Sequence, residues 1–259
     1  MRAYIFGVSI DAVTYRDAFE RTLFFLHGQT PCIIVTQNAE ILLEARRNVL
    51  FRDALNAAHL SFPDGAGAVM AMRIAGIKAE RITGVDFAAD LIEHAAQHNE
   101  RVALIGGTPG RAQIAARKLA EKHPGLTIHA ESQVVFDIKS SGTPVAPEKE
   151  KEVVERLNNF NPAILLAAFG APKQELWIKR ILPRLPSVRI AMGIGGGVDY
   201  WAKTVPRAPK IMRNSGLEWL WRASVQPWRI KRIFNATVVF PALILAEKLK
   251  GTLRSLAIF

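Results

Sequence analysis

The sequence alternates short runs of aliphatic and β-branched residues with longer segments of helical periodicity, and this rhythm restricts the folds open to the chain. The candidate strands are residues 4–8, 33–36, 102–105, 126–129, 164–169 and 189–194. Between them, apolar residues recur at spacings of three and four, as at Ile41, Leu42, Ala45 and Val49. The alternation predicts parallel βαβ units, and therefore an α/β, Rossmann-like fold: a mostly parallel sheet with helices on both faces.

Positive charge is concentrated at the C-terminal end of the chain. Residues 200–259 hold 11 Lys and Arg against 2 Glu, a net charge of +9 out of +11 for all 259 residues. The rest of the chain is close to neutral and has enough apolar residues for a large core. We therefore predict a Rossmann-like catalytic body at residues 1–199 and a basic, aromatic-rich helical appendage at residues 200–259.

The appendage interleaves cations with aromatic side chains. They are Arg207, Lys210, Arg213, Arg222, Arg229, Lys231 and Arg232, with Trp219, Trp221, Trp228 and Phe234. This mixture suits an anionic lipid surface, and arginine can also clamp a diphosphate. Nucleic acid is the competing partner of such a patch. We expect no nucleic acid, because the apolar run that follows, residues 233–246, suits hydrocarbon or protein better than phosphate.

Other features predict a cytoplasmic protein that is peripheral to a membrane. The apolar run is interrupted by Asn235, Thr237 and Pro241 and is shorter than the roughly 20 residues of a spanning helix. The first ten residues show neither the apolar stretch nor the cleavage site of a signal peptide. A single cysteine, Cys32, fits a reducing compartment.

Small and polar residues gather directly after the candidate strands. The segments are TQNAE (36–40), PDGAG (63–67), IGGTPG (105–110), FGAPKQE (169–175) and GIGGGVDYWAK (193–203). Ligands of parallel sheets bind beyond the carboxyl ends of strands, so these segments are the candidate site. Asp64 is its acidic candidate, although a Pro-Asp-Gly sequence is also common in a turn with no catalytic role.

Two glycine-rich segments are compatible with a nucleotide. The amides of Gly106 and Gly107 precede a helix and could receive a phosphate. Gly195 and Gly196 would allow close backbone contact, and Asp199 could accept a hydrogen bond from a ribose or a base. A tight turn and a helix-capping Asp are the alternatives. Neither segment completes the G-x-G-x-x-G fingerprint of dinucleotide binding, and no metal-ligand spacing occurs, so we expect no cofactor and no metal.

Several segments in this order give the chain a specific resemblance. The segments TQNAE, FPDGAGAV, RITGVDF, LIGGTPG, FGAPKQELWI, GIGGGVDYWA and RAPKIMRNSGLEWLWR resemble the WecG/TagA/CpsF glycosyltransferases of family 26 over roughly residues 1–230. The resemblance implies inverting, metal-independent transfer of an N-acetylmannosamine-type sugar from a UDP donor to polyprenyl-diphospho-N-acetylglucosamine. Such transfer occurs at the inner face of the bacterial membrane, in surface polysaccharide or wall teichoic acid synthesis.

The resemblance also implies roles for individual residues. Asp64 matches the proposed general base. Thr36, Asn38, Arg81 and Gln174 match positions that line the same pocket, and Asp199 a position near the uracil. Arg207, Arg213 and Arg222 resemble arginines thought to fold over the diphosphate.

The chain departs from the family pattern at residues 133–136, and at Lys203, where glycine is usual. A homo-oligomer is possible. Two other classes stay open on the sequence alone: a non-catalytic, membrane-associated UDP-sugar-binding protein and a nucleotide-dependent oxidoreductase.

Overall fold

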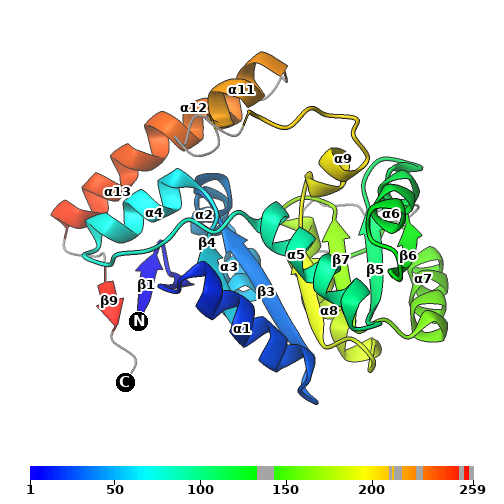
Figure 1. Cartoon of the computed structure of the whole chain (residues 1–259). Coiled ribbons are helices and arrows are strands. Elements are labelled where there is room, and N and C mark those ends of the chain that lie inside the picture. Colours follow the sequence, from blue (N-terminus) through cyan, green and yellow to red (C-terminus); the bar gives the residue numbers. More distant parts are fainter. Residues whose placement is uncertain (133–142, 210–211, 213–217, 226–229, 251–253, 257–259) are drawn as a thin grey trace.

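The fold is built on a parallel six-stranded sheet, seen in a computed structural model that describes residues 1–132, 143–209, 212, 218–225, 230–250 and 254–256 (Figure 1). From edge to edge, the strands are β4 (Leu60–Pro63), β3 (Cys32–Gln37), β8 (Ile190–Gly193), β7 (Ile164–Ala168), β5 (Arg101–Gly106) and β6 (Thr127–Glu131). Every neighbouring pair is parallel. The predicted α/β class and parallel sheet are confirmed.

Helices cover both faces of this sheet. They are α1 (Tyr15–Leu26), α2 (Ala39–Arg47), α3 (Val49–Asn56), α4 (Ala66–Ile74), α5 (Gly84–Gln97), α6 (Arg111–Lys122), α7 (Pro147–Phe160), α8 (Lys173–Ile181) with the 3-10 turn η1 (Leu182–Arg184), and α9 (Gly197–Trp201). Side chains alternate across a strand, so β3 contributes Ile33 and Val35 to one buried cluster and Cys32 and Ile34 to another. This double burial explains why the strands read as continuous apolar runs in the sequence.

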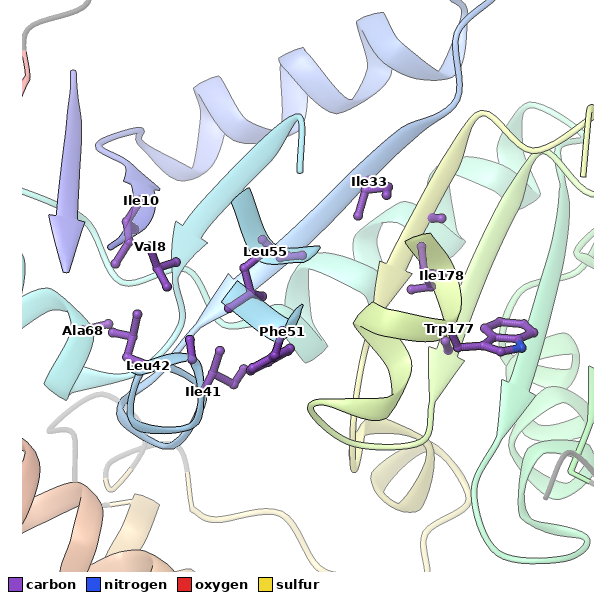
Figure 2. Packing of buried hydrophobic residues seen from close by; sticks show 14 of the residues in the cluster. Val8, Ile10, Ile33, Ile41, Leu42, Phe51, Leu55, Ala68, Trp177 and Ile178 are labelled. Atoms are coloured by element: carbon purple, nitrogen blue, oxygen red, sulfur yellow. The ribbon is translucent and has the colours of Figure 1, made fainter. Parts of the chain in front are cut away.

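The cluster on one face packs α2, α3 and α8 against the sheet, and Figure 2 shows it at close range. Ile41 and Leu42 of α2 lie beside Phe51 and Leu55 of α3 (Figure 2). Trp177 of α8 is fully buried in the same cluster. This packing fixes the N-termini of α2 and α8, both of which begin at the carboxyl edge of the sheet.

Two strand predictions require correction. Residues 4–8 form no strand of the parallel sheet, because Phe6 (φ 51°) and Gly7 (φ 78°) turn the chain between β1 (Arg2–Ile5) and β2 (Val8–Asp11). These strands pair antiparallel and belong to a separate sheet with β9 (Arg254–Leu256). Strand β4 is absent from the predicted set because it is only four residues long, with polar Ser61 in the middle.

Apart from β9, the regular elements described after α9 are helices. They are α11 (Glu218–Val225), α12 (Ile230–Phe234), the π-helix η3 (Asn235–Val239) and α13 (Phe240–Leu249). Elements α12, η3 and α13 follow without a break and run beside α4 (Figure 1). Phe240 and Ile244 are fully buried in the same cluster as β1, α2 and α4. The boundary at residue 199 stays a prediction, but α13 shares its core with the N-terminal half.

No helix within the described ranges is both long enough and apolar enough to span a bilayer.

Candidate active site

Two cavities meet at the carboxyl edge of the sheet. The first, which we call the strand-end cavity, has a volume of about 520 Å³ and is lined by residues at and beyond the ends of β3, β7 and β8, including Thr36, Gly170, Gln174, Gly195 and Gly196. The second, which we call the helix-side cavity, has a volume of about 510 Å³. It lies between α4 and the C-terminal helix and is lined by Met70, Arg81, Arg207, Ile233, Ala236 and Pro241, among others.

Asp64 stands where the two cavities join, since it lines both. Asn38, Glu40, Val85 and Tyr200 also line both. The register of β3 and β4 pairs Gln37 with Pro63, so the residues directly after each strand lie side by side. The backbone of this turn is fixed, because the Asp64 amide donates to the carbonyl of Gln37 at 2.8 Å. The sheet therefore brings together Asn38 and Asp64, which are 26 positions apart.

Asn38 and Thr36 have local structural duties beside their place in the cavity wall. Asn38 is the N-cap of α2, and its Oδ1 accepts from the Ile41 amide at 3.1 Å. A Cβ at Gly84 would lie 2.8 Å from Cγ2 of Thr36, so the N-terminus of α5 contacts Thr36 closely. Only glycine fits at the start of α5 without moving Thr36.

Gln174 connects two glycine turns at the base of the strand-end cavity. Its Oε1 accepts from the amide of Gly170 at 3.1 Å and from the amide of Gly195 at 3.0 Å. Its Nε2 donates to Oε1 of Glu175 at 2.8 Å. A side chain at Gly193 would overlap the amide of Gln174. The predicted substrate-binding residue is thus also a strut that holds the cavity wall.

The arginines of the helix-side cavity come from two distant segments. Arg81 precedes α5, and Arg207 follows α9. Nη1 and Nη2 of Arg207 donate to the two carboxylate oxygens of Asp86 at 2.6 and 2.7 Å. The guanidinium also lies 5.9 Å from the centre of the Tyr200 ring.

Two predicted arginines cannot be placed. Arg213 and the side chain of Arg222 lie outside the described part of the chain, as do residues 133–136. Their assignments stay predictions.

Three predicted nucleotide-binding residues do not line either cavity. Gly106 (φ 113°) and Gly107 (φ 76°) form the tight turn after β5, where a Cβ at Gly106 would contact the backbone of Ala168. Asp199 pairs with Arg111, with Oδ1 3.0 Å from Nη1. In the structure, the two glycines form a turn and Asp199 forms an ion pair; the nucleotide contacts of all three stay predictions.

Sequence reasoning assigned no site role to several residues of the cavity walls, among them Glu40, Tyr200 and Arg232. Glu40 and Tyr200 line both cavities, and Arg232 of α12 lines the strand-end cavity. Oε2 of Glu40 lies 2.5 Å from Nη2 of Arg232, so this ion pair joins α2 to the C-terminal helix. Glu40 is part of the TQNAE segment, and Arg232 is one of the basic residues of the appendage. The sequence showed both residues but not that they face each other.

Comparison with known proteins assigns the chain to a family. A sequence model described as "Glycosyl transferase WecG/TagA/CpsF family" matches residues 3–254. One relative, an N-acetylglucosaminyldiphosphoundecaprenol N-acetyl-beta-D-mannosaminyltransferase of Staphylococcus aureus (strain MRSA252), is 29% identical over 232 residues. That match covers 88% of this chain and 87% of the relative. The resemblance seen in the sequence is confirmed, and the chain belongs to the WecG/TagA/CpsF family of glycosyltransferases.

Proposed function

We propose that this glycosyltransferase moves an N-acetylmannosamine-type sugar from a UDP donor to polyprenyl-diphospho-N-acetylglucosamine, with inversion and with Asp64 as general base. The observation that carries the proposal is the position of Asp64, on the border of two cavities of different character. The S. aureus relative is named for a reaction with the same kind of sugar and acceptor.

The two cavities suit the two substrates. The strand-end cavity lies at the carboxyl ends of β3, β7 and β8, where open α/β sheets bind nucleotides. The helix-side cavity combines apolar Met70, Ile233 and Pro241 with two arginines, Arg81 and Arg207, as a lipid-linked diphosphate requires. We assign the UDP-sugar to the first cavity and the acceptor to the second.

The proposed chemistry places Asp64 between the reacting groups. Its carboxylate takes the proton from the attacking hydroxyl of the acceptor as that oxygen bonds to the anomeric carbon. The bond to UDP breaks on the opposite side of that carbon, so its configuration inverts. The entering and leaving groups therefore need separate spaces, and the joined cavities provide them.

Charge on the departing diphosphate requires positive groups nearby. Arg46, Arg47 and Arg232 line the strand-end cavity, and each is a candidate partner for the leaving group. Arg207, Arg213 and Arg222 are proposed for the acceptor diphosphate. No cluster of three or more potential metal ligands occurs among the described residues. Metal independence stays part of the proposal.

An anionic membrane surface is the proposed partner of the C-terminal helix, which makes the protein peripheral on the cytoplasmic side of the bacterial membrane. Large apolar side chains form an exposed stripe along residues 230–249: Ile230 (67% exposed), Phe234 (54%), Val238 (51%), Leu245 (53%) and Leu249 (89%). Exposed Lys231, Lys248 and Lys250 flank it. Apolar side chains bordered by cations fit the headgroup boundary of anionic lipid. The opposite side of the helix packs into the core through Phe240 and Ile244.

The test of the chemistry is Asp64→Asn. We expect transfer to fall by roughly 10² to 10⁴ fold, the usual contribution of a general base. Binding of UDP, measured by calorimetry, should persist. The assay follows UDP release from UDP-N-acetylmannosamine with a short-chain polyprenyl-diphospho-N-acetylglucosamine acceptor.

Asp53→Asn, on the exposed side of α3, is the matched control and should keep wild-type turnover. Near wild-type turnover in Asp64→Asn would refute the base assignment. A wild-type enzyme that releases no UDP with this pair of substrates would refute the assignment of substrates.

A further inference from the structure

Glu175 is a buried acid that lines neither cavity. It lies in the first turn of α8, directly after Gln174, and is 4% exposed. Its Oε1 accepts the hydrogen bond from Nε2 of Gln174, whereas its Oε2 is buried with no hydrogen-bond partner among the described residues. Burial raises the pKa of the Glu175 carboxyl to about 7.

A second buried acid of the chain shows what full pairing looks like. Glu150 is 3% exposed, and its Oε1 accepts from Nε1 of Trp177 at 2.9 Å. Its Oε2 accepts from Nη1 of Arg180 at 2.7 Å, and Arg184 lies 3.5 Å away. Glu150 therefore joins α7 to α8 and stabilises the fold. Among the described residues, Oε2 of Glu175 lacks the hydrogen-bond partners that Glu150 has. A buried carboxyl oxygen without a partner destabilises the folded state, so burial of Glu175 lowers the stability of the protein.

The contacts of Gln174 show what Glu175 does. The amide oxygen of Gln174 holds the turn after β7 at Gly170 and the turn after β8 at Gly195. An amide has one accepting end and one donating end, and a partner at each end restrains its orientation. The two glycine amides engage the oxygen, and Glu175 engages the nitrogen. Gly170 (φ 74°) and Gly195 (φ 50°) have backbones with little intrinsic restraint, so their positions depend on this strut.

We propose that Glu175 is a positioning residue: it orients the amide of Gln174 so that the two glycine turns keep the shape of the strand-end cavity. The consequence for UDP rests on the function proposed above. Small displacements of a cavity wall carry large penalties in binding and catalysis. The structure thus contains a carboxyl that reduces the stability of the fold and improves the geometry of the site.

The experiment compares three variants. Glu175→Leu removes the acceptor and the buried charge at similar volume. Glu175→Gln keeps an oxygen that can accept from Gln174 and is the conservative rescue. Glu150→Gln is the control, a buried acid outside the site. For each variant we would measure the thermal midpoint Tm, amide hydrogen exchange at Gly170 and Gly195 by NMR, and the Kd for UDP.

We expect Glu175→Leu to preserve or raise the stability of the fold and to weaken the order of the cavity wall. In Glu175→Leu, Tm should be no lower than in wild type, while exchange at both glycine amides accelerates roughly tenfold because the turns open locally. The Kd for UDP should rise roughly tenfold, the loss of about 1.4 kcal/mol. Glu175→Gln should restore slow exchange and affinity to within roughly threefold of wild type. Glu150→Gln should lower Tm with no change in exchange at the two glycines.

Unchanged exchange at Gly170 and Gly195 in Glu175→Leu would overturn the proposal. So would a Glu175→Gln variant that behaves like Glu175→Leu, because charge rather than the hydrogen bond would then be responsible. The exchange measurement needs no ligand. A wild-type protein without affinity for UDP would count against the proposed function alone, whereas intact exchange in Glu175→Leu would count against the role of Glu175.

Discussion

Replacement of Phe240 by alanine tests whether the C-terminal helix is part of the folded core. Phe240 is fully buried, and its ring meets that of Phe6 edge to face with 5.8 Å between centres. It also lies against Gly67 of α4, where an added Cβ would be 3.5 Å from the ring. Truncation of a buried Phe removes about 3–5 kcal/mol through lost burial and the cavity left behind. We expect Phe240→Ala to lower the free energy of unfolding by that amount.

This loss is large beside a typical total stability of roughly 5–15 kcal/mol. For a chain of this size, Tm should fall by roughly 10 °C, and the urea midpoint should fall in parallel. Calorimetry and urea unfolding followed by tryptophan fluorescence measure both quantities. Liposome binding below the new Tm should stay within roughly threefold of wild type, because the exposed stripe is untouched.

Phe234, on the same helix, is the matched control. It is 54% exposed, so Phe234→Ala should change the free energy of unfolding by less than about 0.5 kcal/mol. Its affinity for anionic liposomes should fall roughly tenfold, because the stripe loses its largest side chain. A cost below about 1 kcal/mol for Phe240→Ala would refute the shared core. Equal effects of the two changes on stability would refute the division of the helix into two faces.

Three further outcomes are expected. Gly84→Ala should reduce transfer and cost about 1–3 kcal/mol of stability, because its methyl group would overlap Thr36; a variant with wild-type Tm and turnover would contradict the contact. The pKa of Glu175 is raised from 4.5 to about 7, so ionisation of this carboxyl lowers the free energy of unfolding as pH rises from 4.5 to 7. In Glu175→Leu, urea unfolding should show a smaller fall in this free energy over the same pH range. An unchanged slope of the free energy of unfolding against pH would refute the raised pKa. Lys203 has a left-handed backbone (φ 56°), so Lys203→Gly should raise the free energy of unfolding, measured by urea unfolding, by about 0.5–1 kcal/mol. A fall in the free energy of unfolding would show that the lysine side chain makes compensating contacts.

The sequence predicted part of the candidate site from its predicted strands: Thr36 and Asn38 end or follow β3, and Gln174 follows β7. Asp64 follows β4, which was not among the predicted strands, and was a candidate as the acidic residue of PDGAG. The structure brings all four residues to the strand-end cavity. The family resemblance and the glycosyltransferase class are confirmed over nearly the whole chain. The oxidoreductase alternative is thereby set aside.

Contacts between segments that are distant in the chain could not be predicted from the sequence. Asp86, in the first turn of α5, pairs with Arg207 across 121 positions. Lys203, at a position where the family usually has glycine, has a left-handed backbone (φ 56°). Local conformational demands leave a local signature in the sequence, whereas long-range pairs leave none in a single chain.

The sequence by itself determined the layers of the fold and the edge of the sheet that carries the site. Periodicity of 2 and 3.6 residues is a local property, and burial of both sheet faces makes it visible as apolar runs. Only the tertiary structure decided that the C-terminal helix shares its core with α4, that Asp64 borders two cavities, and that Glu175 fixes Gln174. Each of these depends on which surfaces meet in three dimensions, and that is set by packing of the whole chain rather than by any one segment.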